Sequence, residues 1–303
     1  MVNITHKSFT LRQATAQASV RVSLPETIRA IEERRVPKGD VIEFCRAAGL
    51  LAIKKTADVI PDCHPLPVEY AGISCSVDGL CLVIRVEVHT IYKTGVEVEA
   101  MHGAAVAALT MYDMLKPIDP GIRIENIVLE EKRGGKGDFK DLATSDLSCA
   151  VIVCSDSVSA GTKQDTAGAT VADLCGQYHI PVRYRHIIPD DPAQIQAAAR
   201  EAQANGIQLL LFTGGTGLSP RDVTPDAIRP LLDRDIPGVM EAARSYGQQR
   251  TPYAMLSRGI AGFMGDMLVV TLPGSTKGAR ETMQALFPHL LHVFRMAAGK
   301  RHD

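Results

Sequence analysis

A chain of 303 residues, of which 46% are hydrophobic and 22% charged, has room for about two soluble domains of ordinary size. Its formal net charge of −1 gives no sign of a nucleic-acid or anionic-membrane partner, and it has neither a secretion signal nor an apolar run long enough to span a bilayer. The 7 cysteines form no C-x-x-C pair and their number is odd, which argues against structural zinc and a disulfide framework and predicts a reducing compartment, by default the cytoplasm.

The first half of the chain mixes strands and helices without regular alternation. Apolar residues at helical spacing predict an amphipathic helix over 39–57, whose buried face would be Val41, Phe44, Cys45, Ala48, Leu51 and Ala52. Residues 82–92 alternate between apolar and polar side chains, which predicts a half-buried strand of an antiparallel sheet. An alanine-rich helix is predicted over 97–115, ending before Pro117. Helices against an antiparallel sheet make an α+β domain.

Short polar blocks interrupt these elements, and none matches a standard catalytic motif. They are Lys38-Gly39-Asp40, Lys54-Lys55-Thr56, Cys63-His64-Pro65, residues 93–99, and Asp113 with Lys116. Asp113 and Lys116 lie three apart on one helix face, where a lysine beside a carboxylate can exchange protons if its pKa is tuned. A surface ion pair explains the same spacing, and Cys63 reads equally well as a small buried residue. The residues by themselves leave this half unassigned.

The blocks KGDV, AIKKTADVIPDCHPL, KTGVEVEAM, ALTMYDMLK and EKRGGKGDFK resemble the MoaC family of cyclic pyranopterin monophosphate synthases over about residues 1–140. The resemblance implies a ferredoxin-like fold, a hexamer with its active site between subunits, and no cofactor. The implied reaction rearranges 3′,8-cyclo-7,8-dihydroguanosine triphosphate into cyclic pyranopterin monophosphate and releases pyrophosphate. The family pattern assigns acid–base chemistry to Asp113 and Lys116. It places around the substrate and its phosphates Arg12, Lys38, Cys63, His64, Glu97, Val98, Glu99, Lys132 and Lys136.

Two positions depart from the family pattern. Asp62 precedes Cys-His where the family commonly has leucine, which puts an extra negative charge near an anionic substrate. The glycine-rich stretch 134–137 is one residue shorter than usual, and this bears on the expected roles of Lys132 and Lys136.

The clearest break in the chain runs from Gly134 to Ser148 and places a domain boundary near residue 143, giving domains 1–143 and 144–303. Beyond it, the apolar runs 147–154, 182–188, 207–212 and 267–272 each precede a turn and a helical pattern. One of these helices begins at Asp191-Pro192 and ends at Asn205-Gly206. Strands alternating with helices predict a three-layer α/β fold with a doubly wound, mostly parallel sheet.

Ligands of an open α/β sheet bind at the carboxyl ends of its strands. Small residues follow two of the predicted strands, at 213–217 and 273–275, and their backbone amides could hold an anion. Asp190 and Asp222 also fall at strand ends and suit Mg²⁺ held against phosphate. Taken singly, the glycine-rich turn is an ordinary βα turn, and Asp222 and Asp226 are helix caps. Because Thr224-Pro225 already opens the helix, Asp226 is expected in its first turn in any case. The combination predicts phosphoryl or nucleotidyl transfer.

The stretches SDSVSAGTKQDTAG, LLLFTGGTGLSPRDVTPDAI, PGVMEAARSYG, TPYAMLSR and LPGSTKGA resemble the MoaB/MogA family of molybdopterin adenylyltransferases, across nearly all of residues 147–298. The resemblance implies that molybdopterin and MgATP meet at these strand ends. It carries the catalytic aspartates, which would also be the Mg²⁺ ligands, onto Asp190 and Asp222. It places the pterin phosphate against Thr213, Gly214, Gly215, Thr216 and Gly217, with Ser275 in the same pocket.

Two other functions of the second domain stay open. It could bind molybdopterin or hold an oligomer together without catalysis, or it could hydrolyse a nucleotide pyrophosphate. The partners expected for the whole chain are pterin and nucleotide substrates and further copies of itself in a hexamer or trimer, with no nucleic acid and no membrane. MgATP consumption with and without pterin separates the three functions.

Overall fold

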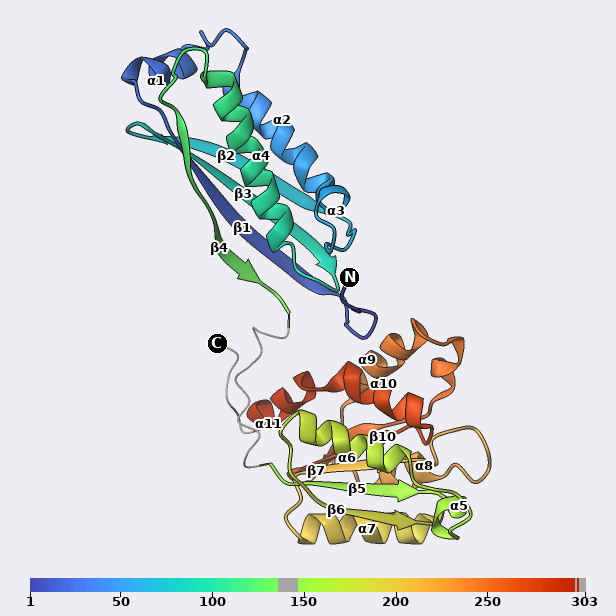
Figure 1. The fold of residues 1–303 in the computed structure, drawn as a ribbon. Helices are drawn as coiled ribbons and strands as arrows, with labels where there is room; N and C mark the ends of the chain where they lie inside the picture. The colour runs from blue at the N-terminus through green and yellow to red at the C-terminus, as the bar shows by residue number, and fades with distance from the viewer. Residues whose placement is uncertain (136–146, 298, 300–303) are drawn as a thin grey trace. The chain divides into compact units, whose positions relative to one another are not determined.

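The computed structural model describes residues 1–135, 147–297 and 299. The chain divides into two compact units, Met1–Lys140 and Asp141–Asp303, and each is described by itself (Figure 1). The boundary expected near residue 143 lies outside the described residues, as does Lys136, so the exact division stays a prediction.

The first unit packs helices against one face of a four-stranded sheet. Its elements are β1 (Thr10–Arg21), α1 (Pro25–Glu32), α2 (Val41–Lys54), α3 (Thr56–Val59), β2 (Tyr70–Asp78), β3 (Cys81–Tyr92), α4 (Glu97–Leu115) and β4 (Arg123–Arg133). The strand order is β2-β3-β1-β4, and every neighbouring pair is antiparallel. This arrangement confirms the α+β prediction.

The long strand and helix of this unit follow their residue patterns. In β3, Ile84, Val86 and Val88 are buried beneath the helices, as predicted, because side chains alternate between the faces of a strand. Helix α4 spans the predicted 97–115. It packs closely on α2 at Gly49, where a Cβ would stand 3.1 Å from the carbonyl oxygen of Gly103.

The prediction for α2 was partly wrong. The expected helix 39–57 is divided into α2 and the one-turn α3, with Asp40 as the N-cap of α2 accepting from the Glu43 amide at 3.2 Å. Phe44 and Leu51, which were assigned to the buried face, are 55% and 61% exposed. Helical spacing alone does not distinguish a face against the sheet from a neighbouring apolar stripe.

The second unit is a three-layer sandwich around a six-stranded sheet. Its strands are β5 (Cys149–Cys154), β6 (Val182–Ile188), β7 (Leu209–Thr213), β8 (Arg234–Asp235), β9 (Ala261–Met264) and β10 (Met267–Leu272). Its helices are α5 (Asp156–Ser159), α6 (Ala167–Gln177), α7 (Pro192–Ala204), α8 (Thr224–Ile228), η2 (Arg229–Leu231), α9 (Pro237–Gln248), η3 (Pro252–Leu256), α10 (Thr276–Leu286), η4 (His289–Leu291) and α11 (His292–Ala297).

The strand order is β6-β5-β7-β10-β9-β8. The first four strands, which are the four predicted ones, are parallel, and β9 and β8 add an antiparallel edge. One core packs α6, α9 and α10 on one face of the sheet, and a second packs α7 and α8 on the other (Figure 1). The doubly wound, mostly parallel architecture is therefore confirmed, and the carboxyl ends of β5, β6, β7 and β10 share one edge.

Candidate functional site

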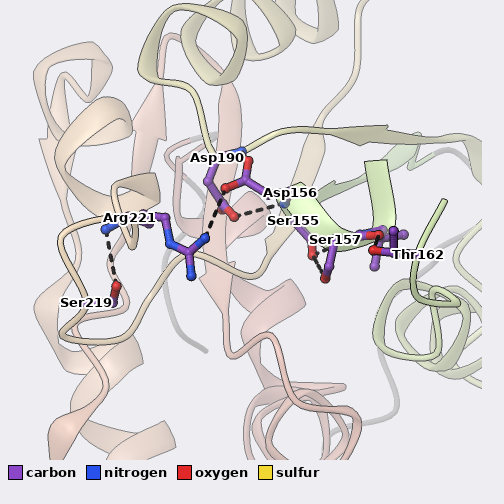
Figure 2. A network of polar contacts seen from close by, with 8 residues as sticks. Ser155, Asp156, Ser157, Thr162, Asp190, Ser219 and Arg221 are labelled. Carbon is purple, nitrogen blue, oxygen red and sulfur yellow. Dashed lines mark hydrogen bonds and ion pairs between the residues drawn. The ribbon is translucent and has the colours of Figure 1, made fainter. Parts of the chain in front are cut away.

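Asp190 and Asp156 are joined by two hydrogen bonds at the edge of the sheet where β5 and β6 end. The Asp190 amide donates to Oδ1 of Asp156 at 3.0 Å, and the Asp156 amide donates to Oδ2 of Asp190 at 3.2 Å (Figure 2). Arg221 reaches the same pair, with its guanidinium 3.9 Å from Oδ2 of Asp156. The other oxygen of Asp190, Oδ1, is buried and has no hydrogen-bond partner within the described residues. This carboxylate is therefore fixed on one side and unsatisfied on the other.

Burial raises the pKa of Asp190. The Asp156 amide opposes that shift, whereas the charges of Asp156 and Asp222 add to it. A carboxylate in this position gains from a nearby cation, because opposite charge favours the ionised form that burial disfavours.

The glycine-rich turn after β7 lies tightly against the neighbouring strand ends. Gly214 has φ +104°, and a Cβ there would stand 2.1 Å from the carbonyl oxygen of Cys154. Thr213 is buried, and its hydroxyl donates to the carbonyl of Pro273 at 2.8 Å, so it braces the turn. The amides of Gly215 to Gly217 form no hydrogen bond with another part of the described chain. Free amides in such a turn can receive an anion.

A cavity of about 490 Å³ collects the residues predicted at this edge. It is lined by Asp190, Asp222 and Ser275, by Thr213, Gly214 and Gly215 of the glycine-rich turn, and by Lys163 and Thr166. A second cavity of about 500 Å³ shares Gly215, Asp222 and Ser275 with it and continues over Thr216, Gly217, Leu218, Tyr253 and Leu256. Ser275 also caps α10 by accepting from the Gly278 amide at 3.1 Å. The expected meeting of the two aspartates with the turn is therefore present in the fold.

The two aspartates considered as helix caps, Asp222 and Asp226, lie differently in the structure. Asp222 does not cap α8; its Oδ2 accepts from the Ser219 amide at 2.8 Å within the preceding loop. Asp226 lies in the first turn of α8, as expected, and pairs with Arg258 at 2.9 Å. Arg258 also donates to the carbonyls of Gly217 and Asp222, and thereby braces the loop between them.

Several residues of this edge were missed or left without a role. Asp156, Arg221 and Arg258 stood in quoted motifs without a role, and Thr224 was read only as the start of a helix. The position of Asp156 directly after a strand was a usable signal, because that is where β5 meets the cavity. The contacts of Thr224 and Arg258 depend on packing across the sheet edge, which no local pattern encodes.

In the first unit, Lys38, Asp113 and Lys116 form one cluster at the C-terminal end of α4. The Asp113 carboxylate lies 2.7 Å from Nζ of Lys38 and 2.8 Å from Nζ of Lys116. Hydrogen bonds from Lys116 and Lys38 lower the pKa of Asp113 to about 2, and Asp113 raises the pKa of Lys116. The lysine is thus held as an ammonium, which suits it to binding phosphate.

A second cluster surrounds the N-terminal end of α4. Glu99 is 2% exposed, and its Oε1 accepts from the Cys63 thiol at 3.3 Å, while Oε2 is buried without a partner among the described residues. Burial raises the pKa of Glu99, and burial likewise raises that of Cys63 to about 11, which keeps the thiol neutral. Glu97 pairs with Lys132 at 3.2 Å.

Three further residues assigned to the substrate lie near this second end. Nε2 of His64 is 2.8 Å from the carbonyl oxygen of Val2, Arg12 donates to the carbonyl of Tyr92 at 3.4 Å, and Val98 is exposed on the first turn of α4. The extra charge of Asp62 pairs with the amino group of Met1 at 2.8 Å.

One copy of the chain does not bring these two clusters together. Glu99 and Asp113 are fourteen residues apart on one continuous helix, which at the α-helical rise separates them by about 21 Å. The residues expected to surround one substrate therefore form two half-sites at opposite ends of α4.

The described part of the chain holds no group of three or more His, Cys, Asp or Glu side chains arranged for a metal ion. Nor does any helix within it have the length and apolar character needed to cross a membrane.

Comparisons with known proteins match both units. The model of the MoaC family matches residues 1–135, and that of the probable molybdopterin binding domain matches residues 150–292. Along its full length the chain is 38% identical to the molybdenum cofactor biosynthesis bifunctional protein of Chlorobaculum tepidum, over 302 residues that cover 100% of this chain and 96% of that protein.

Matches to single units are also close in sequence. The cyclic pyranopterin monophosphate synthase of Listeria welshimeri is 47% identical over 142 residues, which cover 46% of this chain and 88% of that protein. The solved molybdopterin biosynthesis enzyme MoaB of Thermus thermophilus is 40% identical with a TM-score of 0.48, covering 52% of this chain and 99% of that one.

Proposed function

The chain belongs to the family of bifunctional molybdenum cofactor biosynthesis proteins, and we propose that each of its units catalyses one reaction of that biosynthesis. The first unit converts 3′,8-cyclo-7,8-dihydroguanosine triphosphate into cyclic pyranopterin monophosphate and pyrophosphate. The second transfers adenylyl from MgATP to molybdopterin and releases pyrophosphate. We also assign the first unit to the ferredoxin-like class, on its antiparallel strand order β2-β3-β1-β4 with helices on one face.

The cavity shared by Asp190, Asp222 and the glycine-rich turn carries the assignment of the second unit. Adenylyl transfer joins two anionic reactants, so it needs groups that hold phosphate in place and offset its charge. The amide of Gly215 in this cavity, and those of Thr216 and Gly217 in the adjoining one, supply the first of these. In the reaction, a phosphate oxygen of molybdopterin forms a bond to the α-phosphorus of ATP, and the bond to pyrophosphate breaks.

The acidic pair fits Mg²⁺. The unpartnered Oδ1 of Asp190 is an oxygen ligand without a donor, and Asp222 lines the same cavity. Two carboxylates without a third ligand suit an ion that keeps several waters and binds mainly through one or two carboxylates and substrate phosphates. When bound, Mg²⁺ neutralises charge on the phosphates of ATP. Asp190 and Asp222 would hold it, and Lys163, which lines the same cavity, would add a positive charge near the phosphates.

Substitution of Asp222 by Asn tests this assignment. Wild-type protein should consume MgATP only with molybdopterin present, and Asp222→Asn should lose at least about 100-fold in turnover while still binding the pterin. Asp233→Asn, in the loop before β8, is the control and should keep full turnover. Pterin binding without ATP consumption would make this unit a binding module, and ATP hydrolysis without pterin would make it a pyrophosphohydrolase.

The two half-sites at the ends of α4 support a synthase site built from two copies of the chain. A two-fold axis across the middle of this helix would set the Lys38–Asp113–Lys116 cluster of one copy beside the Cys63–Glu99 cluster of the other. The resulting site combines ammonium groups for a triphosphate with a buried carboxyl group. Further association of such pairs would give the hexamer expected from the family resemblance.

Complementation tests this arrangement. Lys116→Ala and His64→Ala chains, each inactive alone, should regain about a quarter of wild-type synthase activity when co-expressed, because random pairing leaves one intact site in each mixed pair. Lys116→Ala with Asp113→Ala is the matched control, since both changes fall in one cluster and no pairing restores a site. Equal activity in the two mixtures would contradict a shared site.

A further inference from the structure

Next to Asp190 are two buried residues that the proposed reaction leaves without a role, one of them in the cavity wall and the other behind it. They are Cys154 at the end of β5 and Thr224 at the start of α8. Thr224 is fully buried, and its hydroxyl oxygen has no hydrogen-bond partner among the described residues. Buried hydroxyls in folded proteins nearly always have a partner, so this one needs a reason.

The unsatisfied oxygens of Thr224 and Asp190 are neighbours. A Cβ built at Gly215 would lie 2.3 Å from Oγ1 of Thr224 and 3.0 Å from Oδ1 of Asp190, so both atoms border the same small space. The Thr224 amide donates to the carbonyl of Gly215 at 3.1 Å, which fixes the start of α8 against the turn. Oδ1 of Asp190 is an acceptor without a donor, and the Thr224 hydroxyl can donate either to it or to the sulfur of Cys154, whose pKa Thr224 lowers against the effect of burial.

None of the other groups around Asp190 is as suitable a hydrogen-bond donor to its Oδ1 as the Thr224 hydroxyl. The Asp156 amide already holds Oδ2, and the Arg221 guanidinium pairs with Asp156. Burial raises the pKa of the Cys154 thiol to about 12, so this group stays neutral and is at best a weak donor. Gly215 contributes no side chain.

We propose that Thr224 is a positioning residue for Asp190, whose Oδ1 accepts a hydrogen bond from the Thr224 hydroxyl when the site binds its metal and nucleotide. This role rests on the proposed adenylyl transfer. With the Asp156 amide on one oxygen and Thr224 on the other, the carboxylate is fixed in rotation. Each hydrogen bond uses one lone pair of its oxygen, which leaves each carboxylate oxygen a further lone pair for a cation. Outer hydrogen bonds of this kind orient a ligating carboxylate.

Thr224→Val and Thr224→Ser separate this role from packing. Valine keeps the shape and removes the hydroxyl, whereas serine keeps the hydroxyl and removes a methyl group. Thr224→Val should lower kcat and weaken Mn²⁺ binding, measured by electron paramagnetic resonance, by about 10- to 100-fold each, with the KM for molybdopterin unchanged. Thr224→Ser should restore both to near the wild-type values, although its loss of a buried methyl group lowers the unfolding temperature.

The outcomes distinguish this role from the proposed function. If the wild-type protein turns over and Thr224→Val has the same kcat and the same Mn²⁺ affinity, the role of Thr224 is overturned and the adenylyl-transfer assignment stands. Equal losses in Thr224→Val and Thr224→Ser would also overturn it, since packing would then be the cause. Wild-type protein that neither turns over nor binds Mn²⁺ would overturn the adenylyl-transfer assignment and this role together.

Discussion

Asp113 and Lys116 are exposed, yet their charges are strongly coupled. Lys116→Ala and Asp113→Ala should each reduce pyranopterin formation by at least about 100-fold, because the pair supplies the ammonium and its orienting carboxylate. Their side chains are 51% and 52% exposed, so the unfolding temperature should hardly change. Product chromatography and thermal unfolding measure the two effects.

The matched control is the Arg46–Glu43 pair on α2, which has the same i,i+3 spacing and a similar exposure. Arg46→Ala should keep wild-type synthase activity. If Lys116→Ala behaved like Arg46→Ala, the acid–base chemistry would belong elsewhere.

The burial of Glu99 leads us to expect that the stability of the folded chain depends on pH. Because burial raises its pKa in the folded chain, the folded state binds the Glu99 proton more tightly than the unfolded state does. Its stabilising contribution is therefore complete below the unfolded pKa, about 4.3, and is lost as the pH rises through the folded value. Cys63, Glu97 and His102 are the other groups that set this value.

Glu99→Gln removes the titration, so its unfolding free energy relative to wild type should increase from pH 4 to pH 8. Urea unfolding at a series of pH values measures this difference. A difference that stays constant with pH would show that Glu99 does not titrate as its burial requires.

Among single residues, the sequence predicted Asp190 and Asp222 because they come after strands, and Asp113 because it shares a helix face with Lys116. Those predictions needed only position along the chain. Asp156 meets Asp190 across two neighbouring strand ends, and Thr224 lies beside Asp190 because the turn at Gly215 approaches both closely. Spacing in the sequence carries no record of that approach.

Among the elements, the start of α1 is tied to the end of α4 through Asp119. This buried carboxylate accepts from the Ser23 amide at 2.7 Å, from the Ser23 and Thr27 hydroxyls, and from the Gly121 amide at 3.1 Å. Asp119→Ala should lower the unfolding free energy of the first unit by about 3 kcal/mol, because it removes four hydrogen bonds to one buried carboxylate. Urea unfolding measures the loss.

Asp78→Ala, at the exposed end of β2, is the control and should change that free energy by less than about 0.5 kcal/mol. The pKa of Asp119 gives a second check. Burial raises it, but the hydrogen bonds from Ser23, Thr27 and Gly121 outweigh burial and lower it overall. The stabilisation is therefore present above the unfolded pKa and is lost as the pH falls through the folded value, a loss that Asp119→Ala should abolish.

The close packing of the turn after β7 predicts that its glycine cannot be replaced as cheaply as a glycine in open space. Gly161 and Gly214 both have positive φ, but a Cβ at Gly161 meets no atom within 4 Å, whereas one at Gly214 meets the Cys154 carbonyl. Gly161→Ala should cost about 1 kcal/mol from backbone strain. Gly214→Ala should cost about 3 kcal/mol and abolish adenylylation, because the turn must move. Equal costs in urea unfolding would contradict the close approach.

Most elements were predictable because their residue patterns match one periodicity over a long run. Helix α4 and strand β3 are examples, and so are the four parallel strands of the second unit. Strands β8 and β9, with two and four residues, are too short to show alternation and were missed. Phe44 and Leu51 were misplaced because an apolar stripe looks the same whether its partner is the sheet of its own unit or something else.

For the whole molecule, the main feature that sequence reasoning could not supply is the separation of the synthase residues. The family resemblance implied a site between subunits, but only the fold places Asp113 and Glu99 at opposite ends of one straight helix. The second unit differs, since its cavity collects both aspartates and the glycine-rich turn within a single chain. On the functions proposed above, one protein would combine a site that needs a second copy with a site that is complete in one copy.

The central claim is that the two units carry separate reactions, and one pair of variants in the full chain tests it directly. Lys116→Ala should lose pyranopterin formation and keep adenylylation of molybdopterin, whereas Asp222→Asn should do the reverse. Both reactions are followed on the same preparations, with wild type beside them. Loss of both reactions in either variant, or wild-type protein that performs only one of them, would contradict the account.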